Sequence, residues 1–135
     1  MLSVAQRARL VAAWIAGAYL AWMYVEMGWV KFDPEGFWTP AFERWGYPTW
    51  LRLLVGFIET AGGVMLVIPW LASYGATGLA LVMIGAWITR LNDGRLVDVG
   101  WLTIYLTVLA WIAFEWWGWR RPLLLLGLRR GARAA

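Results

Sequence analysis

The residues of this sequence that could support chemistry are one acid and three bases in or beside its apolar segments. Glu59 lies near the middle of the run from Trp50 to Val67, which is about long enough to cross a bilayer. An aspartate or arginine at the centre of a membrane-spanning helix costs about 2.5–3.5 kcal/mol. An ionised glutamate there is therefore expected to face a cation or a polar cavity. Three basic residues could supply the cation: Lys31, Arg52 and Arg90.

Helical spacing places these side chains on stripes that also carry small residues. In the run around Glu59, Arg52 and Gly56 precede the acid by seven and three residues, and Gly63 follows it by four. These intervals describe one face of a helix. The corresponding stripe of the preceding run adds Tyr24, and that of the following run adds Thr89. We therefore predict a polar pocket formed by Glu59, Lys31, Arg52, Arg90, Thr89 and Tyr24.

The glycines on the same stripes have a second interpretation. Small residues at such spacings let helices approach closely, which in lipid is a main source of helix association. The predicted packing positions are Gly28, Gly56, Gly62, Gly63, Gly78 and Gly85. The charges also allow a purely structural reading, in which a buried ion network fixes the helix register.

Composition identifies the elements that must position these residues. Of the 135 residues, 62% are hydrophobic, which is well above the apolar content of soluble domains, and only 15% are charged. We predict an all-α fold, an integral membrane four-helix bundle forming one domain over residues 1–135. The expected spans cover residues 10–30, 50–68, 74–91 and 99–118.

The segments between and after the spans carry their own signals. Thr39 and Pro40, followed by Gly46, predict a short helix with a capping residue, an N1 proline and a C′ glycine. Its aromatic residues favour an interfacial helix that covers one end of the bundle. Pro122 is expected to end the fourth span, leaving residues 120–135 as an amphipathic tail on the membrane surface.

Charge distribution predicts the orientation. Seven of the 12 basic residues lie near the two termini, and an even number of spans puts both termini on one side. The positive-inside rule then places both termini in the cytoplasm, and we expect the bacterial inner membrane. Two further acids have simpler expectations. Glu26 lies roughly 140° around the helix from Lys31 and should face a partner subunit or Arg95, and Glu115 should be a surface residue.

Composition also excludes several classes of function. The sequence has no cysteine and no histidine, which removes the commonest metal and haem ligands and the thiol nucleophile. We therefore predict no metal, no covalent cofactor and no independent catalytic residue. The net charge of +4 does not indicate nucleic acid, because in so apolar a chain arginines mark the ends of spans. Thirteen tryptophans fit interfacial belts, with some available to lipid, carotenoid or another subunit.

Several short motifs follow one another between Gly28 and Leu91. They are Gly28-Trp29-Val30-Lys31, Gly46-Tyr47-Pro48-Thr49-Trp50, Glu59-Thr60-Ala61-Gly62-Gly63, Ile68-Pro69, and Val82-Met83-Ile84-Gly85-Ala86 with Thr89. In this order they resemble the DoxX-like family of small four-helix membrane proteins. That family often carries a histidine after the threonine of the third helix, where this chain has Arg90. Arginine does not release its proton near neutral pH, so any proton-handling role of that histidine is altered here.

The resemblance implies two kinds of function. Family members are associated with membrane oxidoreductase systems, including quinone-reducing thiosulfate enzymes, and others act as accessory or assembly partners. One hypothesis is a small subunit of a quinone-linked electron-transport complex, with the quinone held near Glu59. The alternative is a non-catalytic structural subunit of a larger respiratory or photosynthetic complex, held by tryptophan-rich helix faces. Both hypotheses expect membrane lipids and other membrane subunits as partners, and whether the chain belongs to an enzyme stays open.

Overall fold

Helices account for nearly all of the chain in the computed structural model, which describes residues 3–68 and 70–134. No strand occurs within those residues. The elements in chain order are α1 Val4–Trp29, the 3-10 helix η1 Val30–Phe32, α2 Trp38–Arg44, α3 Thr49–Leu66, α4 Ala72–Asn92 and α5 Leu96–Ala134. The predicted all-α fold is confirmed.

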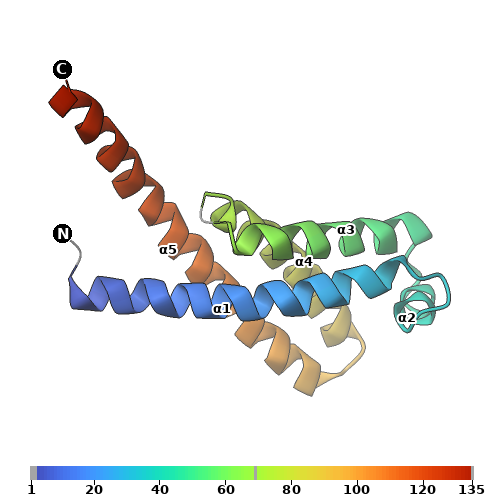
Figure 1. The fold of residues 1–135 in the computed structure, drawn as a ribbon. Helices are drawn as coiled ribbons and strands as arrows, with labels where there is room; N and C mark the ends of the chain where they lie inside the picture. The colour runs from blue at the N-terminus through green and yellow to red at the C-terminus, as the bar shows by residue number, and fades with distance from the viewer. Residues whose placement is uncertain (1–2, 69, 135) are drawn as a thin grey trace.

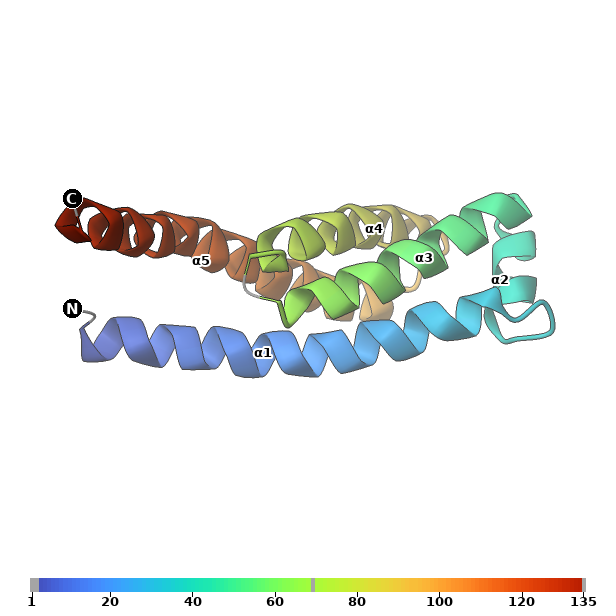
Figure 2. The same ribbon diagram turned by 45° about the horizontal axis from the view of Figure 1, so that its top comes forward.

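Four segments are long and apolar enough to cross a membrane. They are Val4–Phe32, Thr49–Leu66, Ala72–Asn92 and Leu96–Trp117. Both chain ends lie at one end of the molecule, and α2 lies across the opposite end (Figures 1 and 2). The arrangement is the membrane four-helix bundle with a short helix in the first loop that the sequence predicts.

The long helices form a row rather than a square. α3 packs between α1 and α4, and α5 packs mainly on α4 with only local contact to α1. Figure 1 shows α5 running obliquely to the other long helices and crossing α1. The buried core joins all four, and its fully buried side chains include Tyr24, Leu79, Leu109 and Ile112. A bundle of this shape leaves the outer side of α1 and much of α5 without protein neighbours.

Two helix boundaries differ from the sequence-based prediction. α1 begins at Val4 rather than near residue 10, because Ser3 and Gln6 form a capping box that satisfies the first backbone amides. α5 does not end before Pro122 but continues as helix to Ala134. A proline removes one backbone hydrogen bond without necessarily stopping a helix, and the leucines and arginines that follow are strong helix formers. The backbone of residues 120–134 therefore extends α5, and the predicted boundary there is wrong.

α2 ends in a motif that fixes the direction of the chain. The Gly46 amide donates to the Glu43 carbonyl and the Tyr47 amide to the Phe42 carbonyl, both at 2.9 Å. With Gly46 at φ 75°, this is a Schellman cap, as the predicted C′ glycine requires. The rings of Phe42 and Tyr47 pack 5.9 Å apart, the apolar contact that accompanies this cap. At its other end α2 starts at Trp38, so Thr39 is inside the helix rather than its N-cap.

Candidate functional site

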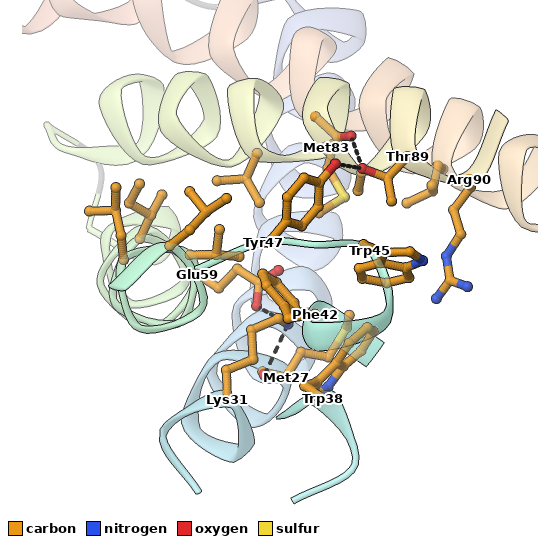
Figure 3. Close-up of a pocket in the computed structure, with 18 of the residues that line it drawn as sticks. Met27, Lys31, Trp38, Phe42, Trp45, Tyr47, Glu59, Met83, Thr89 and Arg90 are labelled. Atoms are coloured by element: carbon orange, nitrogen blue, oxygen red, sulfur yellow. Dashed lines mark hydrogen bonds and ion pairs between the residues drawn. The ribbon is translucent and has the colours of Figure 1, made fainter. Parts of the chain in front are cut away.

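A cavity of about 840 Å³ lies beneath α2, between α3 and α4 (Figure 3). Its walls are mostly apolar and aromatic, and its polar side chains come from η1, from α2 and the residues after it, from α3 and α4, and from the start of α5 and the turn before it. The polar and charged lining residues are Lys31, Tyr47, Glu59, Thr89, Arg90, Arg95 and Asp98, together with the indoles of Trp38, Trp45 and Trp101. A cavity of this size and lining is typical of sites for small molecules.

Close glycine contacts explain why the cavity lies where it does. A Cβ at Gly28 of α1 would lie 2.7 Å from the Gly56 carbonyl oxygen of α3. A Cβ at Gly75 of α4 would lie 2.8 Å from the carbonyl oxygen of Gly62 of α3, nearer the end of the bundle that holds the termini. A Cβ at Gly63 would also lie 3.1 Å from the Ala21 carbonyl oxygen of α1. α3 therefore lies close to α1 along its length, but close to α4 only at the end away from α2. α3 and α4 must diverge towards α2, and the cavity fills the wedge between them.

The widening of the wedge can be followed along α4. At Gly78 an added Cβ would find one neighbour, a methyl carbon of Ile58 at 3.8 Å, and at Gly85 it would find no described atom within 4 Å. Both glycines line the cavity. Their predicted role as packing positions is therefore wrong for Gly85 and weak for Gly78, because α3 has already moved away. Gly75, which the sequence analysis did not select, makes the contact instead.

The other predicted packing glycines lie at helix contacts. Gly28 and Gly56 face each other, and a Cβ at Gly63 would lie 3.1 Å from the Ala21 carbonyl oxygen. A Cβ at Gly62 would lie 2.9 Å from the side chain of Leu79. These four positions therefore hold α3 to α1 and α4, leaving little freedom for a larger side chain.

Lys31 and Glu59 form the charged centre of the cavity. The Lys31 Nζ lies 2.5 Å from the Glu59 Oε2 and 3.3 Å from the Met27 carbonyl oxygen. Both side chains are almost wholly buried, at 3% and 2% exposed. The Lys31 ammonium also lies 4.2 Å from the centre of the Trp38 ring, a cation–π arrangement. Of the three cations that the sequence offers as partners for Glu59, Lys31 is the one that meets it.

Arg52 has a different role from the predicted one. Its guanidinium donates to the backbone carbonyl of Lys31 and, at 3.3 Å, to that of Asp33. Both carbonyls lie where the first helix ends, and that of Asp33 also accepts from the Gly36 amide and the Thr39 hydroxyl. Arg52 therefore helps to cap that end. Arg52 is buried but does not line the cavity. It fixes the backbone that carries Lys31.

Tyr47 and Thr89 form a second polar group on the cavity wall. The Thr89 hydroxyl donates to the Gly85 carbonyl at 2.9 Å, and the Tyr47 hydroxyl lies 2.6 Å from the Thr89 oxygen. A threonine hydroxyl has one proton, so the Tyr47 hydroxyl is the donor in that second bond. Figure 3 shows this pair and the Lys31–Glu59 pair as separate groups. The Tyr47 oxygen keeps lone pairs that could accept a hydrogen bond from a ligand.

Arg90 lies at the α2 end of the cavity, apart from Glu59. Its guanidinium is 3.4 Å from the Asp98 carboxylate and 5.0 Å from the centre of the Trp45 ring. Arg95 is 2.9 Å from the same carboxylate. Trp45 in turn donates from Nε1 to Asp93 at 2.7 Å. These contacts tie the loop around α2 to the turn between α4 and α5 and leave one acid shared by two arginines.

Tyr24 lies outside the cavity lining, in the core beside the α1–α3 contact. Its side chain is fully buried, and its hydroxyl has no hydrogen-bond partner among the described residues. Its helical position, on the same stripe as Gly28 and Lys31, predicts a place in the pocket, and that prediction is wrong. Along that stripe Tyr24 and Gly28 are buried in the packing between helices, and Lys31, nearer to α2, lines the cavity.

The cavity opens sideways. Four of its apolar and aromatic lining side chains, from the α2 loop and from α3, α4 and α5, are themselves exposed: Phe37, Leu54, Leu81 and Trp101. Leu81 lies in the middle of α4, and 66% of its surface is exposed. Leu54, Leu81 and Trp101 lie in helices long and apolar enough to cross a membrane, so the opening is on the side of the bundle where lipid contact is expected.

One polar contact outside the cavity was also missed. Glu115 is buried and pairs with Arg9 across 106 residues, and it accepts a hydrogen bond from Trp111 at 3.2 Å. The expectation of a surface residue is wrong, because the approach of α1 to α5 supplies the cation.

For metals, the described residues contain no group of three or more acid, histidine or cysteine side chains that could hold an ion.

Comparison with known proteins gives one match. The model of the DoxX-like family matches residues 10–113, which include the whole cavity lining and all four predicted spans except the end of the last. No curated protein and no solved structure matches the chain.

Proposed function

The chain belongs to the DoxX-like family, and we propose that it is a small membrane subunit of a quinone-linked electron-transport complex that binds the quinone in the cavity beneath α2. The observation that carries the proposal is the buried Lys31–Glu59 pair in the wall of a large and otherwise apolar cavity. An ion pair with a purely structural role would need less free energy in a closed, well-packed helix contact, because burying two charges requires every remaining polar atom to be hydrogen-bonded.

The residues present fit a quinone. Such a ligand has a flat ring, two carbonyl oxygens and an apolar tail, and it supplies two-electron redox chemistry when bound. The Lys31 ammonium could donate to one carbonyl oxygen, and Trp38, Phe42 and Tyr47 offer aromatic faces for the ring. The exposed side chains of Leu54 and Leu81 mark the side on which a tail would reach the bilayer. The ring, the tail and one carbonyl oxygen of the ligand thus each have a matching part of the cavity.

The role of the chain itself is binding and positioning. Glu59 holds the Lys31 ammonium in place and could accept or return a proton through it. Arg52 fixes the Lys31 backbone, and Tyr47 and Thr89 hold the α2 loop against α4. Electrons would come from a redox-active partner subunit, because the sequence contains no histidine or cysteine to ligate a metal or haem. We place the complex in the bacterial cytoplasmic membrane with both termini in the cytoplasm, as the arginine distribution favours.

The test compares two glycines that differ only in position. Gly85 and Gly100 are both helical and have open space around them, but only Gly85 lines the cavity. We expect gently purified wild-type protein and the Gly100→Leu variant to carry up to one extractable quinone per chain. The Gly85→Leu variant should carry at least tenfold less, because its side chain occupies the wedge. Equal quinone content in the two variants, or none in the wild type, would contradict the proposal.

An alternative function is a non-catalytic structural subunit of a larger respiratory or photosynthetic complex. The observation in its favour is the set of exposed tryptophans on the outer helix faces, which include Trp22, Trp29, Trp50 and Trp117. Tryptophan is enriched where protein surfaces meet, and lipids or carotenoids would also pack on such a surface. A chain extracted from native membranes in mild detergent that runs alone, without a stoichiometric companion, would argue against this function.

A further inference from the structure

Glu26 is a carboxylate that the cavity does not use. It lies within the candidate span Val4–Phe32, six residues before the end of that span, which is about 9 Å along a helix. Its side chain is exposed on the side of α1 away from the bundle. Among the side chains that the structure describes, those of residues 3–68 and 70–117, it has no hydrogen-bond or ion-pair partner. An ionised acid in this place faces lipid unless another molecule covers it.

The surface around Glu26 is a continuous stripe on α1. Val11, Ile15, Trp22, Glu26 and Trp29 are all exposed and follow at intervals of four, seven, four and three residues. These intervals are those of one helix face, opposite the buried glycines that meet α3. We call these five residues the outer α1 face. Two tryptophans flanking one acid give it the composition of a contact surface rather than a random lipid-facing surface.

We propose that the outer α1 face binds a transmembrane helix of another protein that carries an arginine or lysine opposite Glu26. A charge at this depth in lipid has an unfavourable free energy, and pairing with an opposite charge lowers it. The flanking indoles would cover the pair and exclude lipid head groups and water. The proposal rests on the subunit role given above, but it does not depend on quinone binding.

A second copy of this chain is the wrong occupant. Two copies related by a two-fold axis along the membrane normal would place their α1 helices parallel, with one Glu26 beside the other. Like charges at that distance repel. The face also contains no basic residue that could compensate. The charge pattern therefore selects a different protein with a cation at matching depth.

The experiment uses the full chain in its native membranes. A photo-reactive amino acid is placed at position 22 on the outer α1 face and, as a control, at position 104 on α5, which is also exposed. We expect position 22 to crosslink to a transmembrane segment of another protein within one helical turn of an arginine or lysine.

In parallel, the Glu26→Gln and Glu26→Arg variants should retain that partner at least tenfold less than wild type after mild extraction. The control is Glu43→Gln, a change at an exposed acid on α2.

The outcomes separate this proposal from the previous one. Crosslinks only to lipid, to a second copy, or to a segment without a nearby cation would overturn it, as would unchanged partner retention in both Glu26 variants. Recovery of the Glu26→Arg complex by changing the partner's cation to glutamate would establish the pairing. Quinone content is measured in the same samples. Glu26 variants that lose the partner but keep the quinone would support both proposals. Variants that keep both would overturn only this one, and wild-type protein that holds the partner but no quinone would overturn only quinone binding.

Discussion

The two sides of α3 use glycine in opposite ways. On the α1 side, Gly28 and Gly56 bring two backbones into contact, and Lys31 and Glu59 pair just beside them. On the α4 side, the close backbone contact is between Gly62 and Gly75, and beyond it the helices diverge until a Cβ at Gly85 would meet no described atom within 4 Å. One side is closed along its length and the other opens into a cavity.

The difference shows that a small-residue stripe has no fixed meaning in a membrane protein. Glycine permits close approach but does not cause it, because the position of the neighbouring helix also depends on its other contacts. At the α2 end α3 lies close to α1 and away from α4, and hydrogen bonds from Trp45 and Tyr47 reach Asp93 and Thr89 across that side. The side with the shorter contact region is then available for a ligand.

The largest expected effect comes from breaking the charge pair on the closed side. The Lys31→Met variant leaves Glu59 buried without a cation, which should lower the free energy of unfolding by about 3–5 kcal/mol. The Lys31→Met/Glu59→Leu double variant should recover most of that loss but carry no quinone. Reversible unfolding in mixed detergent micelles measures the first effect. A single variant as stable as wild type would mean that the pair is dispensable and the closed side is held by glycines alone.

A smaller effect is expected from filling the closed side. A Cβ at Gly28 would lie 2.5 Å from the Thr60 hydroxyl oxygen and 2.7 Å from a backbone oxygen. The Gly28→Ala variant should therefore lose about 1–3 kcal/mol of unfolding free energy, as overpacked sites do. Gly100→Ala serves as control, since no described atom lies within 4 Å of that position. Equal stability of the two variants would show that α1 and α3 can separate without cost.

The hydrogen bond that holds the α2 loop to α4 should contribute less. The Tyr47→Phe variant keeps the ring against Phe42 and removes the hydroxyl that meets Thr89. We expect a loss of about 1 kcal/mol in unfolding free energy, together with faster hydrogen exchange in residues 38–47. Tyr19→Phe, at an exposed tyrosine on α1, is the matched control. Unchanged exchange in the Tyr47→Phe variant would show that the loop is held by Trp45 and Arg90 instead.

The smallest change is expected on the open side, with the opposite sign. The Gly85→Ala variant adds a methyl group where there is room and removes the helix penalty of glycine, so it should gain about 0.5–1 kcal/mol. Thermal unfolding of Gly85→Ala beside Gly28→Ala gives the direct comparison of the two sides. A loss of stability at Gly85 would mean that the wedge closes when no ligand is present.

The sequence predicts the architecture well and the site only in part. Hydropathy locates the spans, because a helix crossing lipid must be apolar over a fixed length. It also identifies Glu59 as the residue that needs a partner and narrows that partner to three cations. Hydropathy does not choose among the three cations. The choice depends on the backbone after α1, which brings Lys31 to Glu59 and gives Arg52 carbonyl oxygens to bind. The Arg52 contacts with backbone carbonyls follow from the 3-10 turn after α1. No pattern of residues in the sequence predicts that turn.

Other features depend on lateral positions that no stripe encodes. Gly78 and Gly85 share a face and were assigned the same role as Gly62, but α3 has diverged from α4 by the time it reaches their level. The Arg9–Glu115 pair joins two helices that touch only locally, so nothing in either segment indicates the other. Pro122 was taken as a helix end, although proline costs a helix one hydrogen bond and other residues can outweigh that cost.

The α2 segment has a consequence for the thermodynamics of binding. On one side, Trp38 lies over the Lys31 ammonium and the Thr39 hydroxyl donates to the Asp33 carbonyl. On the other, Trp45 and Tyr47 are bonded to Asp93 and Thr89. The width of the cavity is thus set by the protein before any ligand arrives. A molecule entering from the bilayer would lose little free energy to the ordering of side chains or backbone, so even a modest set of contacts could retain it.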